Sequence, residues 1–172
     1  MRKFFLGLLG ICFLAAPAWA HDDPNAEFFA GYSYRRVDLI VVDRNAHGFH
    51  FAGAGYFNKY FGLEGDVSGH YGSVAGVNFQ NYLVMGGPKV TARFERVTPF
   101  AHALFGLNNI RGGGLSSSDF ALGAGGGLDV NATPHVAIRV GQVDYIYVRV
   151  REGTLRENAN GFRASFGVVF KW

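Results

Sequence analysis

The chain has 172 residues, of which 49% are hydrophobic and 17% charged, with 16 basic and 13 acidic side chains. This length suits a single domain, and the apolar content excludes a disordered chain. Glycine occurs 25 times without a three-residue period, which excludes collagen and favours strands over helices, where each glycine costs about 1 kcal/mol relative to alanine.

The first twenty residues have the pattern of a secretory signal peptide. Arg2 and Lys3 precede an apolar run from Phe4 to Ala18, and Ala18-Trp19-Ala20 matches a small-residue cleavage site. We therefore predict a signal peptide over residues 1–20. The alternative, an uncleaved anchor, needs about 20 apolar residues, and this run is shorter.

Cleavage would leave a mature domain over residues 21–172. It would remove Cys12, the only cysteine, and lower the net charge from +3 to about +1. A mature chain without disulfides must be held together by its core or by a closed sheet. Its nearly neutral charge gives no indication of a nucleic-acid partner.

Apolar and polar residues alternate along most of the mature chain, and a period of two predicts β-strands. In the last segment, Phe162, Phe166 and Phe170 share one face while Arg163 and Lys171 occupy the other. The pattern is less regular in the fourth segment, and it slips near Gln142–Asp144, where a bulge would be natural. The eight predicted strands are residues 27–35, 49–58, 61–71, 79–90, 99–108, 119–130, 135–148 and 162–172.

Strands of about ten residues are long enough to cross a bilayer at a tilt. After the leader, no apolar run reaches the length of a transmembrane helix. We expect short connections at 58–60, 91–98 and 131–134, and longer polar loops at 37–47, 72–78, 109–118 and 149–159. Loops sorted in this way are typical of an even-stranded outer-membrane barrel. The prediction is an all-β, eight-stranded antiparallel up-and-down transmembrane β-barrel that is monomeric.

On the leader, the eight alternating strands and the terminal aromatic residue, the chain resembles the small outer-membrane β-barrels, the OmpA-like transmembrane domain and opacity-protein group. Phe166, Val168, Phe170 and Trp172 resemble the assembly signal of that group, although Trp replaces the commoner Phe at the end. The resemblance implies the outer membrane of a Gram-negative bacterium. It also implies contact with outer-membrane lipid, lipopolysaccharide and the barrel assembly machinery.

Charged residues lie on the predicted inward faces, where an eight-stranded barrel is filled by side chains. Because buried ions need partners, we expect Glu64 and Asp129 to pair with Arg139 or Arg163, and the resemblance also implies a carboxylate–arginine network. Two interpretations remain, a structural plug and a gate or narrow ion path. The predicted inward charges are Glu64, Asp66, His70, Asp129, Arg139, Arg163 and Lys171.

Candidate chemistry is sparse, and we predict no catalytic, cofactor-binding or metal-binding residues. His47 and His50 lie on opposite faces of a strand. Successive side chains of the row from Glu64 to His70 are about 6.6 Å apart, too far for one metal ion. An outer-membrane lipid-modifying enzyme would need a triad at the outer rim, and Ser116–Ser118 has no nearby histidine. A soluble barrel for an apolar ligand would need the opposite arrangement of faces.

The last external segment contains Arg149, Arg151 and Arg156. Loops on rigid scaffolds commonly carry recognition, and arginines at the membrane rim can pair with lipopolysaccharide phosphates. The alternative is a solvated loop. We predict a structural or surface-interaction role, in envelope integrity, adhesion or host contact, with an unidentified surface ligand bound through these loops.

Overall fold

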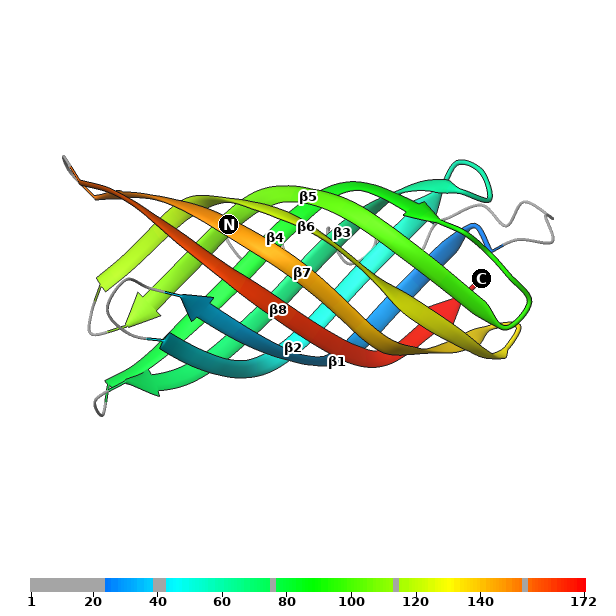
Figure 1. Cartoon of the computed structure of the whole chain (residues 1–172), viewed down its shortest axis with the longest axis horizontal. Helices are drawn as coiled ribbons and strands as arrows, with labels where there is room; N and C mark the ends of the chain where they lie inside the picture. Colours follow the sequence, from blue (N-terminus) through cyan, green and yellow to red (C-terminus); the bar gives the residue numbers. More distant parts are fainter. Residues whose placement is uncertain (1–23, 39–42, 75–76, 113–114, 153–154) are drawn as a thin grey trace, which may run out of the picture.

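The computed structural model describes residues 24–38, 43–74, 77–112, 115–152 and 155–172, and within these ranges all regular structure is β-strand. The eight strands form one closed antiparallel barrel (Figure 1). Their bounds are β1 (Ala26–Asp38), β2 (Asp43–Tyr56), β3 (Phe61–Val74), β4 (Val77–Thr91), β5 (Val97–Gly112), β6 (Leu115–Thr133), β7 (Val136–Glu152) and β8 (Leu155–Lys171).

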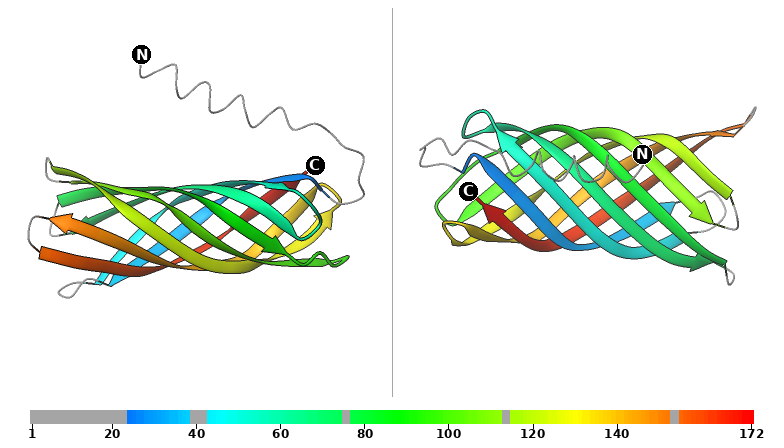
Figure 2. Two further views of the ribbon diagram at one scale, coloured as in Figure 1. Left: turned by 90° about the horizontal axis from the view of Figure 1, so that it is seen from above. Right: turned by 180° about the vertical axis from the view of Figure 1, so that it is seen from behind.

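Each strand pairs with its neighbours in sequence, and β1 pairs with β8 to close the sheet. At one end of the seam, the Ala26 amide donates to the Trp172 carbonyl at 3.0 Å and the Trp172 amide donates to the Ala26 carbonyl at 3.1 Å. The start of β1 and the end of β8 therefore lie together, at what we call the terminal end (Figure 2). Closure removes the unpaired edges that an open sheet would expose.

The outward face of the barrel is apolar. Phe166 and Phe170 are 56% and 46% exposed, whereas Arg163 and Lys171 on the same strand are 0% and 5% exposed. A soluble monomer does not present an apolar surface of this extent to water, so the exterior suits hydrocarbon. Other exposed apolar side chains are Phe28, Phe51, Leu63, Val84, Phe105, Leu122, Ile138 and Val143. No helix in the described part of the chain is long and apolar enough to span a bilayer.

The prediction of long polar loops at the end away from the termini, called the far end, is wrong. Strand pairing there continues to Val74↔Val77, Gly112↔Leu115 and Glu152↔Leu155. Outside hydrocarbon, both faces of a strand meet water and apolar alternation fades, while the backbone ladder continues. The polar residues predicted as loops at 37–47, 72–78, 109–118 and 149–159 are therefore largely extensions of the strands.

The sequence leaves the register of the fourth and seventh strands open, and the pairing of β4 and β7 determines it. In β4, every second residue from Asn81 to Thr91 is buried, without interruption. In β7, the register shifts between Arg139 and Gln142, slightly before the predicted slip at Gln142–Asp144. Because of this irregularity, Arg139, Gln142 and Asp144 all face inward, at 0%, 1% and 1% exposure.

The seam between β1 and β8 depends on a pair of facing glycines. Gly31 and Gly167 are cross-strand partners. A Cβ on Gly167 would overlap the carbonyl oxygen of Ala30, and a Cβ on Gly31 would overlap that of Phe166 and the Phe29 ring. Glycine is required here because the two backbones approach too closely for any side chain.

Candidate functional site

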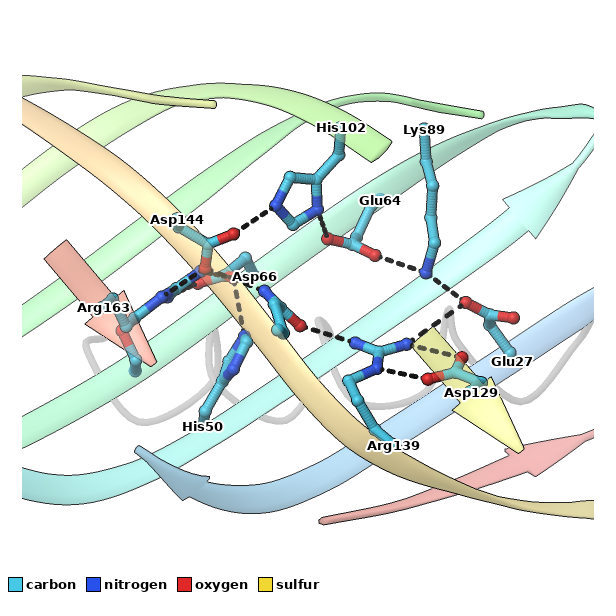
Figure 3. Close-up of polar contacts among 12 residues, drawn as sticks. Glu27, His50, Glu64, Asp66, Lys89, His102, Asp129, Arg139, Asp144 and Arg163 are labelled. Atoms are coloured by element: carbon cyan, nitrogen blue, oxygen red, sulfur yellow. Dashed lines mark hydrogen bonds and ion pairs between the residues drawn. The ribbon is translucent and has the colours of Figure 1, made fainter. Parts of the chain in front are cut away.

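A continuous network of charged side chains fills the middle of the barrel (Figure 3). Arg163 of β8 is fully buried and contacts carboxylates from two other strands. Its Nη1 and Nη2 donate to Asp66 of β3 at 2.8 and 2.6 Å, and its Nε donates to Asp144 of β7 at 2.8 Å. Arg163 therefore joins opposite walls with the planar, bidentate geometry that makes arginine–carboxylate pairs strong.

His102 of β5 extends the network from Asp144 to Glu64. Its Nε2 lies 2.8 Å from Asp144 Oδ1, and its Nδ1 lies 2.6 Å from Glu64 Oε1. Each ring nitrogen therefore faces a carboxylate oxygen, and His102 bridges the two acids. Lys89 of β4 continues the chain, with its Nζ 2.7 Å from Glu64 Oε2 and bonded to Glu27.

Arg139 is the second arginine of the network. Its Nε and Nη2 donate to the two carboxylate oxygens of Asp129 at 2.8 and 3.1 Å. The guanidinium also stacks between the rings of Phe29 and Phe100, at 4.3 and 4.1 Å from their centroids. Gln142 accepts from Arg139 at 2.8 Å and donates to Asp144 at 2.8 Å, which links the two arginines.

The structure places the five residues of the predicted network in the lumen, and it revises one expected partner. Asp129 pairs with Arg139, while Glu64 contacts Lys89 and His102 and, among the described residues, no arginine. Glu27, Lys89, His102 and Asp144 were missing from the predicted network. Glu27 and His102 already lay on inward faces by alternation, but Lys89 and Asp144 required the registers of β4 and β7. The predicted residues are Glu64, Asp66, Asp129, Arg139 and Arg163.

The row from Glu64 to His70 along β3 serves several partners rather than one ligand. Ser68 accepts from Arg163 at 3.0 Å, and His70 Nε2 lies 2.9 Å from Ser33 Oγ. His50 contacts Asp66 at 2.7 Å inside the barrel, whereas His47 is exposed on the opposite face, as alternation predicts. Among the described residues, no group of three or more His, Cys, Asp or Glu side chains is arranged to hold a metal ion.

The described residues do not assemble a hydrolytic triad. Ser33 and His70 form a serine–histidine pair, but both side chains are fully buried and His70 Nδ1 has no hydrogen-bond partner. A triad needs a carboxylate at that nitrogen. At the far end, Ser118 accepts from Asn109 and Ser117 donates to Asp119, both at 2.8 Å. The arrangement therefore offers no support for lipid hydrolysis.

The lumen also contains an apolar layer that sequence alternation did not emphasise. Along β4, Leu83 and Met85 lie between Asn81 and Lys89, and across the ladder they face Ser68 and Asp66 of β3, so this layer lies beside the charged network. Its members are Leu83, Met85, Leu104, Ala121, Ile146 and Val148. Paired charges and packed apolar groups together close the interior.

At the terminal end, Lys171 donates to Asn131 Oδ1 at 2.6 Å and borders a hollow of about 380 Å³ that also touches Pro24 and Arg93. Its lining comes from the connections at this end and from the adjoining ends of β5, β6 and β8. The hollow therefore lies outside the network at the centre of the lumen.

The remaining predicted site residues belong to β8 and to the β7–β8 hairpin. Phe166, Val168, Phe170 and Trp172 project outward from the β8 end of the seam. Arg149 is exposed on β7, and Arg151 and Arg156 are cross-strand partners near the tip of the β7–β8 hairpin. These three arginines therefore belong to a paired ribbon and not to the predicted loop, because the ladder continues to Glu152↔Leu155.

A closed eight-stranded barrel with an apolar exterior and paired charges inside defines a small outer-membrane β-barrel protein. No protein-family model and no curated protein sequence matches the chain. Several solved structures are similar to it. Neisserial surface protein A (NspA) is similar at a TM-score of 0.69 and 17% identity, over 86% of this chain and 97% of that chain.

Two further outer-membrane proteins have the same architecture. Ail, the attachment invasion locus protein of Yersinia pestis, is similar at a TM-score of 0.58 and 21% identity, over 87% of this chain and 99% of that chain. OprG from Pseudomonas aeruginosa is similar at a TM-score of 0.57 and 9% identity, over 89% of this chain and 98% of that chain. These similarities show the fold. The protein is located in the outer membrane.

Proposed function

We propose that this protein has a non-enzymatic structural or surface-interaction role, in envelope integrity, adhesion or host contact. The observation that carries the proposal is the filled lumen, in which Arg139, Arg163 and Lys89 are paired with carboxylates and an apolar layer lies beside them. A packed interior favours action at the surface over transport. As a monomer, the protein would then act through the ends of its strands.

The far end is the surface that we assign to the cell exterior. An even number of strands returns the chain to the side on which it started, and outer-membrane barrels have longer segments outside the cell than in the periplasm. At the far end the polar stretches 72–78, 109–118 and 149–159 continue the strand pairs beyond the apolar alternation, so these hairpins are the longer segments. The terminal end contains both strand termini and the turns after Tyr56, Thr91 and Thr133. The β7–β8 ribbon, with Arg149, Arg151 and Arg156, would then reach beyond the lipid headgroups.

Anionic groups are the ligands that this ribbon suits best. Arginine binds phosphate and sulfate oxygens through parallel N–H donors. Ail has been solved in complex with the heparin analogue sucrose octasulfate, so a barrel of this architecture can bind a polysulfated sugar. For this chain we propose phosphate groups of lipopolysaccharide or sulfated surface glycans.

The test is binding of fluorescent sucrose octasulfate to intact cells that express the protein. Replacing Arg149, Arg151 and Arg156 together with glutamine should abolish most of the binding. A matched variant with glutamine at Lys59, Arg93 and Arg96 makes the same charge change at the terminal end and should bind as wild type. Equal binding by both variants, at equal amounts of heat-modifiable folded protein, would contradict the proposal. Binding to lipopolysaccharide-coated beads distinguishes lipopolysaccharide phosphates from sulfated surface glycans as the ligand.

A narrow ion path is a second candidate, favoured by the continuity of the network from Arg163 through His102 to Lys89. Such a path would open by exchange of carboxylate partners. Planar-bilayer recordings of the purified barrel test it, with Lys89→Met expected to change conductance if the network is a gate. Absence of channel activity in the wild type would remove this candidate.

Export and assembly complete the proposal. We assign residues 1–20, which lie outside the described residues, to a cleaved leader. We assign Phe166, Val168, Phe170 and Trp172 to recognition by the barrel assembly machinery. These side chains face outward, where an assembly factor could reach them. Replacing Phe170 with serine should lower the amount of folded barrel in the outer membrane without altering export.

A further inference from the structure

The far half of the lumen holds a buried cation that contacts no carboxylate among the described residues. Arg35 of β1 is 2% exposed. Its Nη1 donates to Asn81 Oδ1 at 2.7 Å and to Asn108 Oδ1 at 3.4 Å. Arg139 and Arg163, which are also buried, each contact at least one carboxylate. A buried charge without a counter-ion is strongly destabilising.

Unused hydrogen-bond donors accompany this charge. Arg35 Nε, Asn108 Nδ2 and His70 Nδ1 are all buried without a partner. Ser165 Oγ donates to Ser33 Oγ at 3.2 Å, so the Ser33 hydroxyl is free to donate to His70 Nε2 at 2.9 Å. A neutral imidazole that accepts at Nε2 carries its proton on Nδ1. In the tautomer in which Ser33 donates to Nε2, all three unpartnered atoms are donors.

The lumenal carboxylates that the structure describes are engaged elsewhere. Asp66 and Asp144 bind Arg163, which is the cross-strand partner of Arg35. Leu83 and Met85 of the apolar layer separate Asn81 from Lys89 and its carboxylates along β4. Asp119, which faces Asn108 across β5 and β6, accepts a hydrogen bond from Ser117, and no ion pair joins it to Arg35 in the described part of the chain.

We propose that Arg35, Asn108 and His70 bind a monatomic anion, chloride in the natural environment. One negative charge would compensate the guanidinium, and three donors would satisfy its coordination. Water could accept from the same donors but would leave the charge of Arg35 uncompensated. A halide is spherical and accepts from donors in any direction, which suits three enclosed donors that come from different strands. The site stands apart from the surface role proposed above.

Bromide serves as the probe in the first test. The mature barrel is crystallised from detergent in sodium bromide, and anomalous scattering locates the ion. We expect an anomalous peak within hydrogen-bond distance of Arg35 Nε, lost in Arg35→Met and retained in Arg36→Gln. Arg36 is the adjacent residue, exposed on the opposite face, so this control removes the same charge outside the lumen. A wild-type crystal with only water at Arg35 would overturn the proposal.

Solution stability gives the second test, which does not depend on crystals or on a variant that folds. An ion that binds only the folded state raises stability with the logarithm of its concentration. We expect the urea midpoint of the wild-type barrel to rise when chloride replaces gluconate at constant ionic strength. Asn108→Ala, which removes one donor and leaves the Asn81 contact, should reduce that shift. Equal midpoints in the two salts would refute a chloride site.

Discussion

Replacing Arg163 with methionine tests the idea that the charged network is a set of mutually dependent pairs. The substitution removes the cation that Asp66 and Asp144 share, and Asp66 loses both hydrogen bonds that it receives from the guanidinium. His50 and His102 remain beside these carboxylates. Removing one partner of a buried ion pair costs about 3 to 5 kcal/mol, because the other charge is left uncompensated. We expect a loss in this range.

A double-mutant cycle with Asp66 distinguishes the loss of the ion pair from the loss of packing around Arg163. Asp66→Asn removes the charge that Arg163 was meant to balance, so the double variant should lose about 2 kcal/mol less than the sum of the single variants, within the usual range for directly contacting residues. Asp129→Asn is the matched control. Asp129 contacts Arg139 and reaches Arg163 only through Arg139, Gln142 and Asp144. Because Asp129 and Arg163 share no direct partner, the two effects should add to within about 0.5 kcal/mol.

Urea unfolding in lipid vesicles provides the assay. The chain has two tryptophans, Trp19 in the predicted leader and Trp172. Trp172 is 52% exposed at the end of the seam, so the mature barrel reports unfolding through a single fluorophore. The reasoning fails if the free energy of unfolding of Arg163→Met stays within about 0.5 kcal/mol of the wild-type value. It also fails if the effects of Arg163→Met and Asp66→Asn add as closely as those of Arg163→Met and Asp129→Asn.

Three further predictions concern the seam, the orientation and the leader. Gly167→Ala should destabilise the barrel by about 1 to 3 kcal/mol through overpacking, whereas Gly55→Ala, with no atom within 4 Å of the added Cβ, should leave the urea midpoint almost unchanged. In the mature chain, Ser118→Cys should react with an impermeant maleimide on intact cells and Thr133→Cys should not; labelling at Thr133 alone would reverse the orientation. Mass spectrometry of the purified protein should show cleavage after Ala20, and retention of the leader would contradict the proposed processing.

Sequence alternation was sufficient for the number of strands and for the two faces of the wall. A period of two places Phe166 and Phe170 on the side opposite Arg163 and Lys171 in any strand, and hydrocarbon outside leaves the charged side no place but the lumen. Strand ends were predicted less well. Hydrophobic alternation marks the part of a strand in the bilayer, while the ladder between β7 and β8 continues to Glu152↔Leu155.

Only the closed barrel decides which inward charges meet. Arg163 and Asp66 come from β8 and β3, and His102 and Asp144 come from β5 and β7. Their contacts depend on strand stagger across the lumen, which local patterns do not encode. The bulge between Arg139 and Gln142 brings Asp144 inward, and closure isolates Arg35 from the acids. The chain alone determines which residues are enclosed, whereas three-dimensional distances determine which charges are neutralised and which one still needs a counter-ion.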